Sequence, residues 1–446
     1  MEEEIGKLHI VMVPWFAMGH LLPFFELSKS LALKGLQISF FTTPSNIHRL
    51  PSIPKTLTPL LKFIPCSPST MNTENTSDLH YVDNRPLLHQ TYDALEHHLV
   101  AFLSDPSRSK PNWIIFDIKA ISWAPALASR FSINSAFFII FCAAAIAFVE
   151  RFKKLDSSEN LATASDLIPF PTTVTFRRFE ALRFRSLLLK EIDNSSKKLI
   201  LTRTFREFEA KWIDLLGENC IPVGFLPSPI NEEESETYTR ISKWLDKQKE
   251  LSVIYVGFGA EAILTSEQIA EIALGLEKCG LPFIWVLWVG SPPQNFDERT
   301  SGRGLVWMGW VPQSRLLAHR AIGGFLTHGG WGSVVEGMVV GVALAVLPMQ
   351  FEHGLNARHL VESGYAVEVV RNDEDGYFSG EEIARKLRIV MVEEEGEVVR
   401  KKARKGKEIF GSKKLQEEYI TELVKNLWQR CKMSDRNIPR FAAIVT

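Results

Sequence analysis

The sequence has little that would place it in a membrane, in an oxidising compartment or on a charged polymer. Its 446 residues include only five cysteines, widely separated and never arranged as Cys-x-x-Cys, so neither a disulfide framework nor a zinc site is expected. The longest apolar run, 135–149, is shorter than the roughly 20 residues that span a bilayer, and the acidic start is unlike a signal peptide. No charge of one sign predominates, because 51 basic residues face 52 acidic ones. We therefore expect a cytoplasmic protein with no nucleic-acid partner and no stable membrane insertion.

Short apolar segments rich in branched and aromatic residues alternate with segments of helical periodicity in both halves of the chain. The main strand candidates are 8–15, 36–43, 112–118 and 133–140 in the first half and 252–259, 281–287, 304–310, 322–328, 343–348 and 366–370 in the second. Thr265 and Gln268 have the spacing of a capping box before one of the helices. This order predicts an α/β fold of two Rossmann-like domains, whose parallel sheets face each other across a cleft.

The domain limits are predicted from the segment in which the alternation of strand and helix candidates is interrupted. Residues 224–239 are rich in proline, serine and acidic residues and lack periodicity, which is typical of a linker. We expect one domain at 1–223 and a second at 240–446, with the C-terminal helix placed to pack back on the first. The basic run 400–407 follows an acidic stretch and is expected to form an exposed helix face.

The most informative segment is Trp310–His353, WVPQSRLLAHRAIGGFLTHGGWGSVVEGMVVGVALAVLPMQFEH. It predicts a strand, a glycine turn and a helix that begins near Ser333. Free N–H groups and the helix dipole at such a junction favour a phosphate, to which His328 and Ser333 can donate further hydrogen bonds. Glu336, one turn into the helix, can accept hydrogen bonds from a ribose diol. A phosphorylated ligand is therefore expected.

These residues form Trp-x-Pro-Gln, then Thr-His-x-Gly-Trp-x-Ser-x-x-Glu, then an acidic pair site. The segment resembles the signature box of the plant-type family 1 UDP-dependent glycosyltransferases, and the order of elements fits this family across essentially the whole chain. The resemblance implies a GT-B-like fold and a UDP-sugar as co-substrate. No other cofactor and no metal are expected, because no Asp-x-Asp motif for a metal-bound diphosphate is recognised. The donor-binding residues that it implies are Trp310 on the uracil, Gln313 and Glu336 on the ribose, His328 and Ser333 on the diphosphate, Glu352 and His353 on the donor sugar, together with Trp331, Gly332 and Ala260. A purely structural role is the alternative for each of them.

The segment departs from the family pattern in three ways. Gly332 replaces an asparagine that contacts phosphate in the family, and Ala260 replaces the usual serine after Gly-Phe-Gly. Both changes remove a polar side chain from the phosphate side. The box commonly ends in Asp-Gln for glucose donors, whereas here it ends in Glu352-His353, and a terminal histidine is associated with galactose in the family.

A rival interpretation of the second half is a nicotinamide dehydrogenase. Gly257–Ala262 matches Gly-x-Gly-x-x-Ala of dinucleotide-binding folds. The following helix begins only near Thr265, however, and the next strand candidate ends without the acidic residue that would bind a ribose. The dehydrogenase interpretation is therefore disfavoured.

The first half offers an acid–base pair. Inverting glycosyl transfer needs a base for the acceptor hydroxyl, and a histidine with an ordinary pKa of about 6.5 suits this at cellular pH. His20 follows the first strand and Asp117 ends a later one, so both can reach the same edge of the sheet, and the resemblance implies the same two residues as catalytic. A turn residue at His20 and a helix cap at Asp117 are the alternatives.

The first half is also expected to bind the acceptor. The candidate lining is bulky and apolar and consists of Trp15, Phe16, Met18, Gly19, Ile118, Phe141 and the segment 184–189. Core packing is the alternative for each. The segment 174–189 mixes arginine with phenylalanine and leucine at helical spacing, and we expect its arginines to be solvated.

These observations predict an inverting hexosyltransferase that uses a UDP-sugar, with UDP-glucose as the preferred donor. The stretches PSNIHRLP and RTFREFEA resemble the branch that adds a sugar to terpenoid, steroid or flavonoid glycosides, so the expected acceptor is a sugar already attached to a lipophilic natural product. Direct O-glucosylation of an aglycone, galactosyl or rhamnosyl transfer, and a non-catalytic nucleotide-sugar binder are the alternatives. We expect a monomer whose partners are the acceptor and the UDP-sugar.

Overall fold

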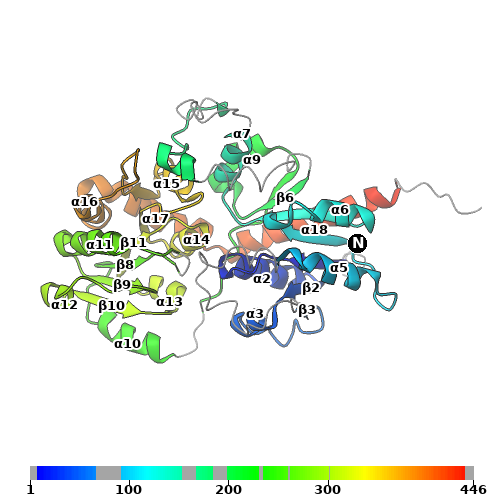
Figure 1. Cartoon of the computed structure of the whole chain (residues 1–446), viewed down its shortest axis with the longest axis horizontal. Coiled ribbons are helices and arrows are strands. Elements are labelled where there is room, and N and C mark those ends of the chain that lie inside the picture. The colour runs from blue at the N-terminus through cyan, green and yellow to red at the C-terminus, as the bar shows by residue number, and fades with distance from the viewer. Residues whose placement is uncertain are drawn as a thin grey trace, which may run out of the picture. The chain divides into compact units, whose positions relative to one another are not determined.

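The chain forms two compact α/β units, each built on one parallel sheet (Figure 1). The computed structural model describes residues 8–66, 92–152, 167–183, 198–230, 235–259, 262–300 and 302–436. Unit 1 takes its described residues from Met1–Ile140, Glu191–Leu226 and Lys413–Thr446, and unit 2 from Phe141–Lys190 and Pro227–Ser412. The predicted fold of two Rossmann-like domains with parallel sheets is confirmed.

Unit 1 has a seven-stranded sheet. In spatial order its strands are β3 (Leu61–Pro65), β2 (Gln37–Thr42), β1 (His9–Val13), β4 (Trp113–Asp117), β5 (Asn134–Ile139), β6 (Leu199–Thr202) and β7 (Cys220–Pro222). Its helices are α2 (Met18–Leu33), α3 (Pro44–Arg49), α5 (Leu95–Ser104), the 3₁₀ turn η1 (Ile118–Ala120), α6 (Ala124–Arg130), α9 (Arg206–Leu216) and α18 (Lys413–Arg436). Helices cover both faces of the central strands, which explains why β1 and β4 are apolar along almost their whole length.

The strand order of unit 1 reverses between β1 and β4. From β1 the chain moves outward to β2 and β3, and then returns to place β4 on the other side of β1. Val13 pairs with Phe116, so the two strands end at the same edge of the sheet. In open parallel sheets such a reversal leaves a crevice at the carboxyl ends of the strands, where ligands bind.

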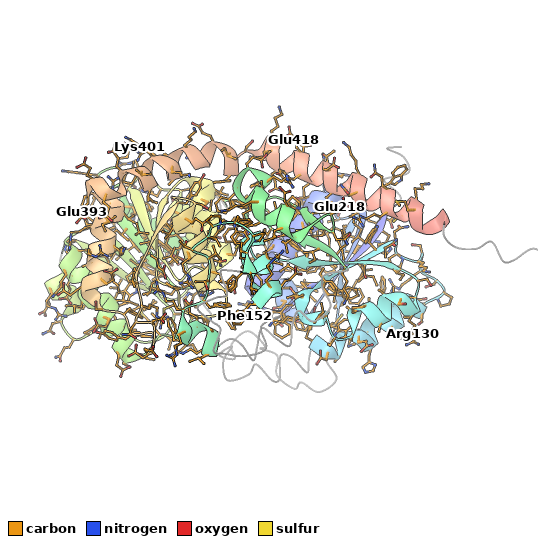
Figure 2. The ribbon with its side chains drawn as sticks, turned by 90° about the horizontal axis from the view of Figure 1, so that it is seen from above. Arg130, Phe152, Glu218, Glu393, Lys401 and Glu418 are labelled. Carbon is orange, nitrogen blue, oxygen red and sulfur yellow. The ribbon has the colours of Figure 1, made fainter. Side chains whose placement is uncertain are left out.

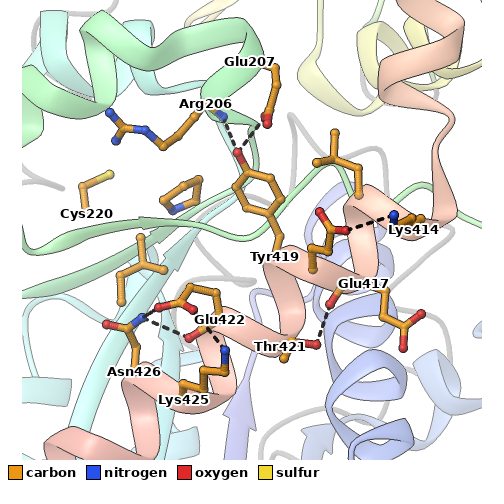
Figure 3. A pocket seen from close by; sticks show the side chains of 14 residues that line it. Arg206, Glu207, Cys220, Lys414, Glu417, Tyr419, Thr421, Glu422, Lys425 and Asn426 are labelled. Atoms are coloured by element: carbon orange, nitrogen blue, oxygen red, sulfur yellow. Dashed lines mark hydrogen bonds and ion pairs between the residues drawn. The ribbon is translucent and has the colours of Figure 1, made fainter.

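The C-terminal helix α18 belongs to unit 1. The Gln416 side chain donates to the carbonyl of Val223 (2.8 Å) and accepts from the N–H of Leu226 (2.9 Å). Tyr419 accepts from the backbone N–H of Arg206 (2.8 Å) and donates to Glu207 (2.7 Å), as Figure 3 shows. These bonds fasten α18 to α9 and to the segment after β7.

Figure 3 also shows the pocket that this junction leaves on unit 1, with a volume of about 800 Å³. Residues of α9, β7 and α18 line it, and opposite charges are mixed in its wall. None of the residues predicted for catalysis, donor binding or acceptor binding lines this pocket.

Unit 2 has a six-stranded parallel sheet. In spatial order its strands are β10 (Gly304–Met308), β9 (Phe283–Leu287), β8 (Val253–Gly257), β11 (Ile322–Thr327), β12 (Ala343–Val346) and β13 (Ala366–Glu368). Its helices are α7 (Ala143–Phe152), α10 (Glu236–Leu245), α11 (Ser266–Cys279), α12 (Phe296–Arg299), α13 (Gln313–Leu317), α14 (Trp331–Val340), α15 (His353–Glu362), α16 (Gly380–Met391), the 3₁₀ turn η4 (Glu394–Gly396) and α17 (Glu397–Phe410). The strand order reverses here between β8 and β11.

Two local predictions for unit 2 are confirmed. Thr265 and Gln268 form the capping box at the start of α11, each side chain bonding the backbone N–H of the other residue. The basic run lies on α17, which buries Val399, Ala403 and Phe410 and exposes its lysines. Figure 2 shows Lys401 projecting outward from this helix, where it pairs with Glu397.

Residues of the first half of the chain contribute to both units. The segment that includes α7 and the stretch 167–183 groups with unit 2, whereas the sequence led us to place all of 1–223 in one domain. Contacts between α7 and α15 explain this grouping. The limits 1–223 for an acceptor-binding domain, 224–239 for a linker and 240–446 for a UDP-sugar-binding domain stay predictions. No helix among the described residues is long and apolar enough to cross a membrane.

Candidate active site

Unit 1 brings His20 and Asp117 together at the reversal of strand order. His20 lies in the first turn of α2, directly after β1, and Asp117 is the last residue of β4. Their side chains meet with 2.7 Å between His20 Nδ1 and Asp117 Oδ2. The Asp117 side chain is 1% exposed and the His20 side chain 14%. A buried carboxylate therefore holds an imidazole that still reaches the surface of the unit.

Asp117 also caps a helical turn, which was the alternative role predicted for it. Its Oδ1 accepts the backbone N–H of Lys119 (3.1 Å) and so caps the turn η1, while Oδ2 bonds His20. The cap fixes the carboxylate, and the carboxylate in turn fixes the imidazole. Because Nδ1 donates to a carboxylate, the neutral ring carries its lone pair on Nε2, which is the nitrogen suited to accept a proton.

The aromatic residues beside this pair serve the core of unit 1. Trp15 has no exposed surface and packs edge-on against Tyr92, with ring centroids 5.0 Å apart. Phe16 is also buried and packs against the same ring (5.6 Å). Tyr92 donates to the carbonyl of Val13 (3.1 Å), which stabilises the end of β1. Burial raises the pKa of its phenol, so the hydroxyl keeps the proton that it donates. No sequence pattern pointed to Tyr92.

The other acceptor candidates differ in exposure. Gly19 is exposed, Met18 is half-buried and Ile118 is buried. Phe141 is half-buried and groups with unit 2 rather than with the others. Segment 184–189 lies outside the described residues. Acceptor binding by all of these positions, and by Trp15 and Phe16, stays a prediction.

In unit 2, three residues that were predicted to bind the UDP-sugar share one hydrogen-bond network. Gln313 at the start of α13 donates through Nε2 to Glu336 Oε2 (2.6 Å) and to Ser333 Oγ (3.2 Å), both on α14. Two residues that the sequence did not reveal complete the network: Ser314 donates to the other Glu336 oxygen (2.9 Å), and Tyr255 donates to Gln313 Oε1 (3.3 Å). Burial raises the pKa of Tyr255, which keeps it a hydrogen-bond donor. The network orients the Glu336 carboxylate.

The helix that carries Ser333 and Glu336 starts earlier than predicted. We expected Gly329–Gly332 to form a turn and the helix to begin near Ser333, but α14 begins at Trp331 with Gly330 as its N-cap. The expectation was wrong because Gly332 can take helical angles, and only Gly329 needs a positive φ (+88°). Gly332 and Ser333 thus lie in the first turn, where backbone N–H groups have no partner within the helix.

The two tryptophans of the signature box have opposite environments. Trp310 follows β10 and is 60% exposed, so most of its indole is open to the surface. Trp331 is 2% exposed. A ligand can therefore reach the Trp310 ring, whereas the Trp331 side chain is buried. Ala260 lies outside the described residues.

Two imidazoles lie side by side beyond the ends of β11 and β12. The rings of His328 and His353 are 4.8 Å apart and nearly perpendicular. Burial lowers the pKa of His328 to about 4, and burial together with His328 lowers the pKa of His353 well below its ordinary value. Both rings are therefore neutral at cellular pH. Gln350 donates its backbone N–H to His353 Nδ1 (3.3 Å), which leaves the ring proton on Nε2.

The loop before α15 holds backbone strain. Phe351 has φ of +52°, a left-handed conformation that costs a bulky residue roughly 1 kcal/mol or more. It immediately precedes Glu352, which is buried and occupies the N-cap position of α15. Strain of this kind is concentrated at functional loops, and here it marks the loop that carries Glu352 and His353.

The glycine turn makes room for His328, and this can be tested. A Cβ on Gly330 would lie 2.4 Å from His328 Nε2, so Gly330→Ala must displace the imidazole. We expect it to weaken UDP binding about tenfold, the free energy of one good hydrogen bond. Calorimetric titration with UDP measures this. Gly337→Ala on the same helix is the control, because the new methyl would meet the Leu344 and Phe325 side chains and not His328; equal affinity of both variants would contradict the prediction.

The acidic side chains do not form a metal site among the described residues. Among the described residues, no group of three or more His, Cys, Asp and Glu side chains is arranged to hold a metal ion. The chain contains one Asp-x-Asp triplet, Asp373–Asp375, a pattern that our sequence predictions overlooked. Asp373 accepts the backbone N–H of Arg178 (3.3 Å), and Glu374 pairs with the Arg178 guanidinium (3.1 Å). The triplet thus holds a surface turn against the segment that begins at Arg177.

Two parallel α/β sheets, with a His–Asp pair at the strand reversal of one and a glycine turn with a polar network in the other, define a glycosyltransferase of the GT-B class. A solved structure supports this. It is the complex between 3,4-dichloroaniline and a UDP-glucosyltransferase from Polygonum tinctorium that is capable of glucosylating indoxyl. It matches with a TM-score of 0.78 and 26% sequence identity, over 95% of this chain and 99% of that one.

Sequence comparisons give the family. The family model "UDP-glucoronosyl and UDP-glucosyl transferase" matches residues 231–396. UDP-glycosyltransferase 91C1 of Arabidopsis thaliana is 39% identical, over 94% of this chain and 96% of that protein. Soyasaponin III rhamnosyltransferase of Glycine max is 35% identical, over 94% of each. The chain belongs to the plant family 1 UDP-glycosyltransferases.

Proposed function

We propose that this enzyme moves a sugar from a UDP-sugar, preferably UDP-glucose, with inversion, to a sugar already attached to a lipophilic plant natural product. The bond between His20 and Asp117 at the reversal of strand order carries the proposal. His20 Nε2 takes the proton of the acceptor hydroxyl as its oxygen bonds to the anomeric carbon, and the bond from that carbon to UDP breaks. Asp117 stabilises the imidazolium that forms.

The network around Glu336 supports a nucleotide role for unit 2. Gln313 and Ser314 hold the Glu336 carboxylate in one orientation, as recognition of two neighbouring ribose hydroxyls requires. Trp310 offers an exposed ring on which uracil can stack. The first turn of α14 and the neutral His328 supply donors for the diphosphate.

The acceptor is the less constrained part of the proposal. The Glycine max relative is a soyasaponin III rhamnosyltransferase, and a saponin already carries sugar. This supports a glycoside as acceptor, and rhamnosyl transfer is a second possible donor specificity. His353, at a position where the family commonly has glutamine, keeps galactosyl transfer as a further alternative. Metal independence, a cytoplasmic location and a monomeric state stay predictions from the sequence.

The test is a product screen by mass spectrometry. UDP-glucose, UDP-galactose and UDP-rhamnose are each incubated with glycosylated and free triterpenes, steroids and flavonoids. A product one hexose heavier than a glycoside supports the proposal. A product formed only from free aglycones would contradict the sugar-on-sugar part, and UDP binding without any product would favour a non-catalytic nucleotide-sugar binder.

Glu336 provides a test of donor binding alone. We expect Glu336→Ala to raise the dissociation constant of UDP by about tenfold to a hundredfold, because hydrogen bonds to a charged group contribute about 1.5–3 kcal/mol. Glu381→Ala is the control, since that side chain on α16 is 67% exposed and pairs with the exposed Lys278 of α11. Calorimetry with UDP measures both. Unaltered UDP affinity of Glu336→Ala would remove Glu336 from the donor site.

A further inference from the structure

The buried side-chain amide of Asn356 lies between two loops, and each loop carries residues that were predicted to bind the UDP-sugar. Asn356 lies on α15 and has no exposed surface. Its Nδ2 donates to the carbonyl oxygen of Gly329, in the turn between β11 and α14 (2.9 Å). Its backbone N–H makes the ordinary helical bond to the carbonyl of Glu352, the N-cap residue of α15 (3.0 Å), so Asn356 lies one turn from the loop that carries Glu352. Both loops lie in unit 2, so this connection is internal to one unit.

The two loops also touch directly. A Cβ on Gly329 would lie 2.8 Å from Val346 Cγ1 and 3.2 Å from the carbonyl oxygen of His353. No side chain other than hydrogen fits between the turn and the start of α15. A shift of either loop would therefore move the other, and the side chain of Asn356 is the polar group that fixes their relative position.

Holding the Gly329 carbonyl also sets the direction of a donor. In a planar trans peptide the C=O and the following N–H point in opposite directions. The bond from Asn356 therefore turns the N–H of Gly330 away from α15. Gly330 is the N-cap of α14, and its N–H is the first of the groups at this helix end that an anion can bind.

The amide of Asn356 is itself fixed at its other end. Asn356 Oδ1 accepts from the thiol of Cys142 (3.2 Å), and the Cys142 sulfur accepts the backbone N–H of Ala145 in the first turn of α7 (3.4 Å). A flipped amide would set its oxygen against the oxygen of Gly329. The thiol and the carbonyl thus select one orientation.

We propose that Asn356 is a positioning residue for the donor: it holds the Gly329–Gly330 peptide so that the start of α14 faces the diphosphate, and it couples this turn to the loop of Glu352 and His353. This inference rests on the proposed function, because it assumes that unit 2 binds a UDP-sugar. Asn356 acts through the backbone and touches no donor atom itself.

Two variants of similar size test the proposal. Asn356→Asp and Asn356→Leu both lose the donor to Gly329, but only the first adds charge. We expect both to raise the dissociation constant of UDP and the KM for the UDP-sugar about tenfold, as for one lost hydrogen bond. The KM for the acceptor and kcat at saturating donor should change less than about threefold. A merely structural role would lower the melting temperature but leave the UDP affinity of the folded protein unchanged.

Cys142→Ala is the matched control, because it removes the partner of Oδ1 and leaves the bond to Gly329. We expect its UDP affinity to stay within about twofold of the parent. The inference is overturned if the Asn356 variants bind UDP like the parent, if only the aspartate variant is weakened, or if Cys142→Ala weakens binding equally. Failure of the parent to bind UDP would overturn the proposed function and this inference together.

Discussion

His20→Ala is expected to lower kcat by about three to four orders of magnitude while leaving UDP binding unaltered. The reason is that the catalytic pair and the residues proposed to bind UDP lie in different units. His20 and Asp117 belong to unit 1, whereas the network of Gln313 and Glu336 belongs to unit 2. Without the imidazole, the acceptor hydroxyl must lose its proton to water, which is a much weaker base. Initial rates at saturating donor and acceptor measure the effect.

Asp117→Asn refines this test. The amide keeps the size of the carboxylate but cannot stabilise the imidazolium, so we expect a loss of about tenfold to a thousandfold, smaller than that of His20→Ala. His97→Ala, an exposed histidine on α5, is the control and should retain full activity. Unchanged turnover of His20→Ala would remove the histidine from the mechanism. Loss of UDP binding in the same variant would contradict the separation of acceptor and donor functions.

The sequence predicted those features that depend on short-range patterns. Each strand candidate of 8–15, 112–118 and 322–328 contains an observed strand, because a buried parallel strand is a continuous apolar run. The pair His20–Asp117 was also predicted, although 97 positions separate the two residues, since each lies near the carboxyl end of a strand and both strands end at one edge of the sheet. Strand order in a doubly wound sheet brings such ends together.

Features that depend on packing were not predictable. Tyr255, Ser314 and Asn356 have no local signature, because their partners are defined only when separate elements come together. The burial of Trp331 was likewise not predictable, and its role in donor binding stays a prediction. Arg177 was expected to be solvated, but it is half-buried and pairs with Glu368 (3.1 Å). Helical periodicity reports a local element and does not reveal the surface on which it packs.

The same packing creates the strongest expected effect on stability, at Arg358. This residue of α15 has a side chain that is 8% exposed, and its guanidinium binds Glu180, Glu368 (2.9 Å) and the carbonyl of Thr175 (2.7 Å). Arg358→Ala would leave Glu180 buried without its cation and Glu368 with Arg177 alone. Removing one partner of a buried ion pair costs about 3–5 kcal/mol, so the melting temperature of unit 2 should fall by roughly 10 °C.

Arg385→Ala is the matched control, since Arg385 pairs with Glu382 on the surface of α16, where its side chain is 47% exposed. An exposed pair contributes at most about 1 kcal/mol, so thermal unfolding followed by calorimetry should separate the two variants clearly. Equal melting temperatures would mean that water reaches Glu180 and Glu368 and that the network is not buried in solution. A loss confined to Arg358→Ala would instead show that the segment 167–183 is held on α15 through these charges, next to the loop that carries Glu352 and His353.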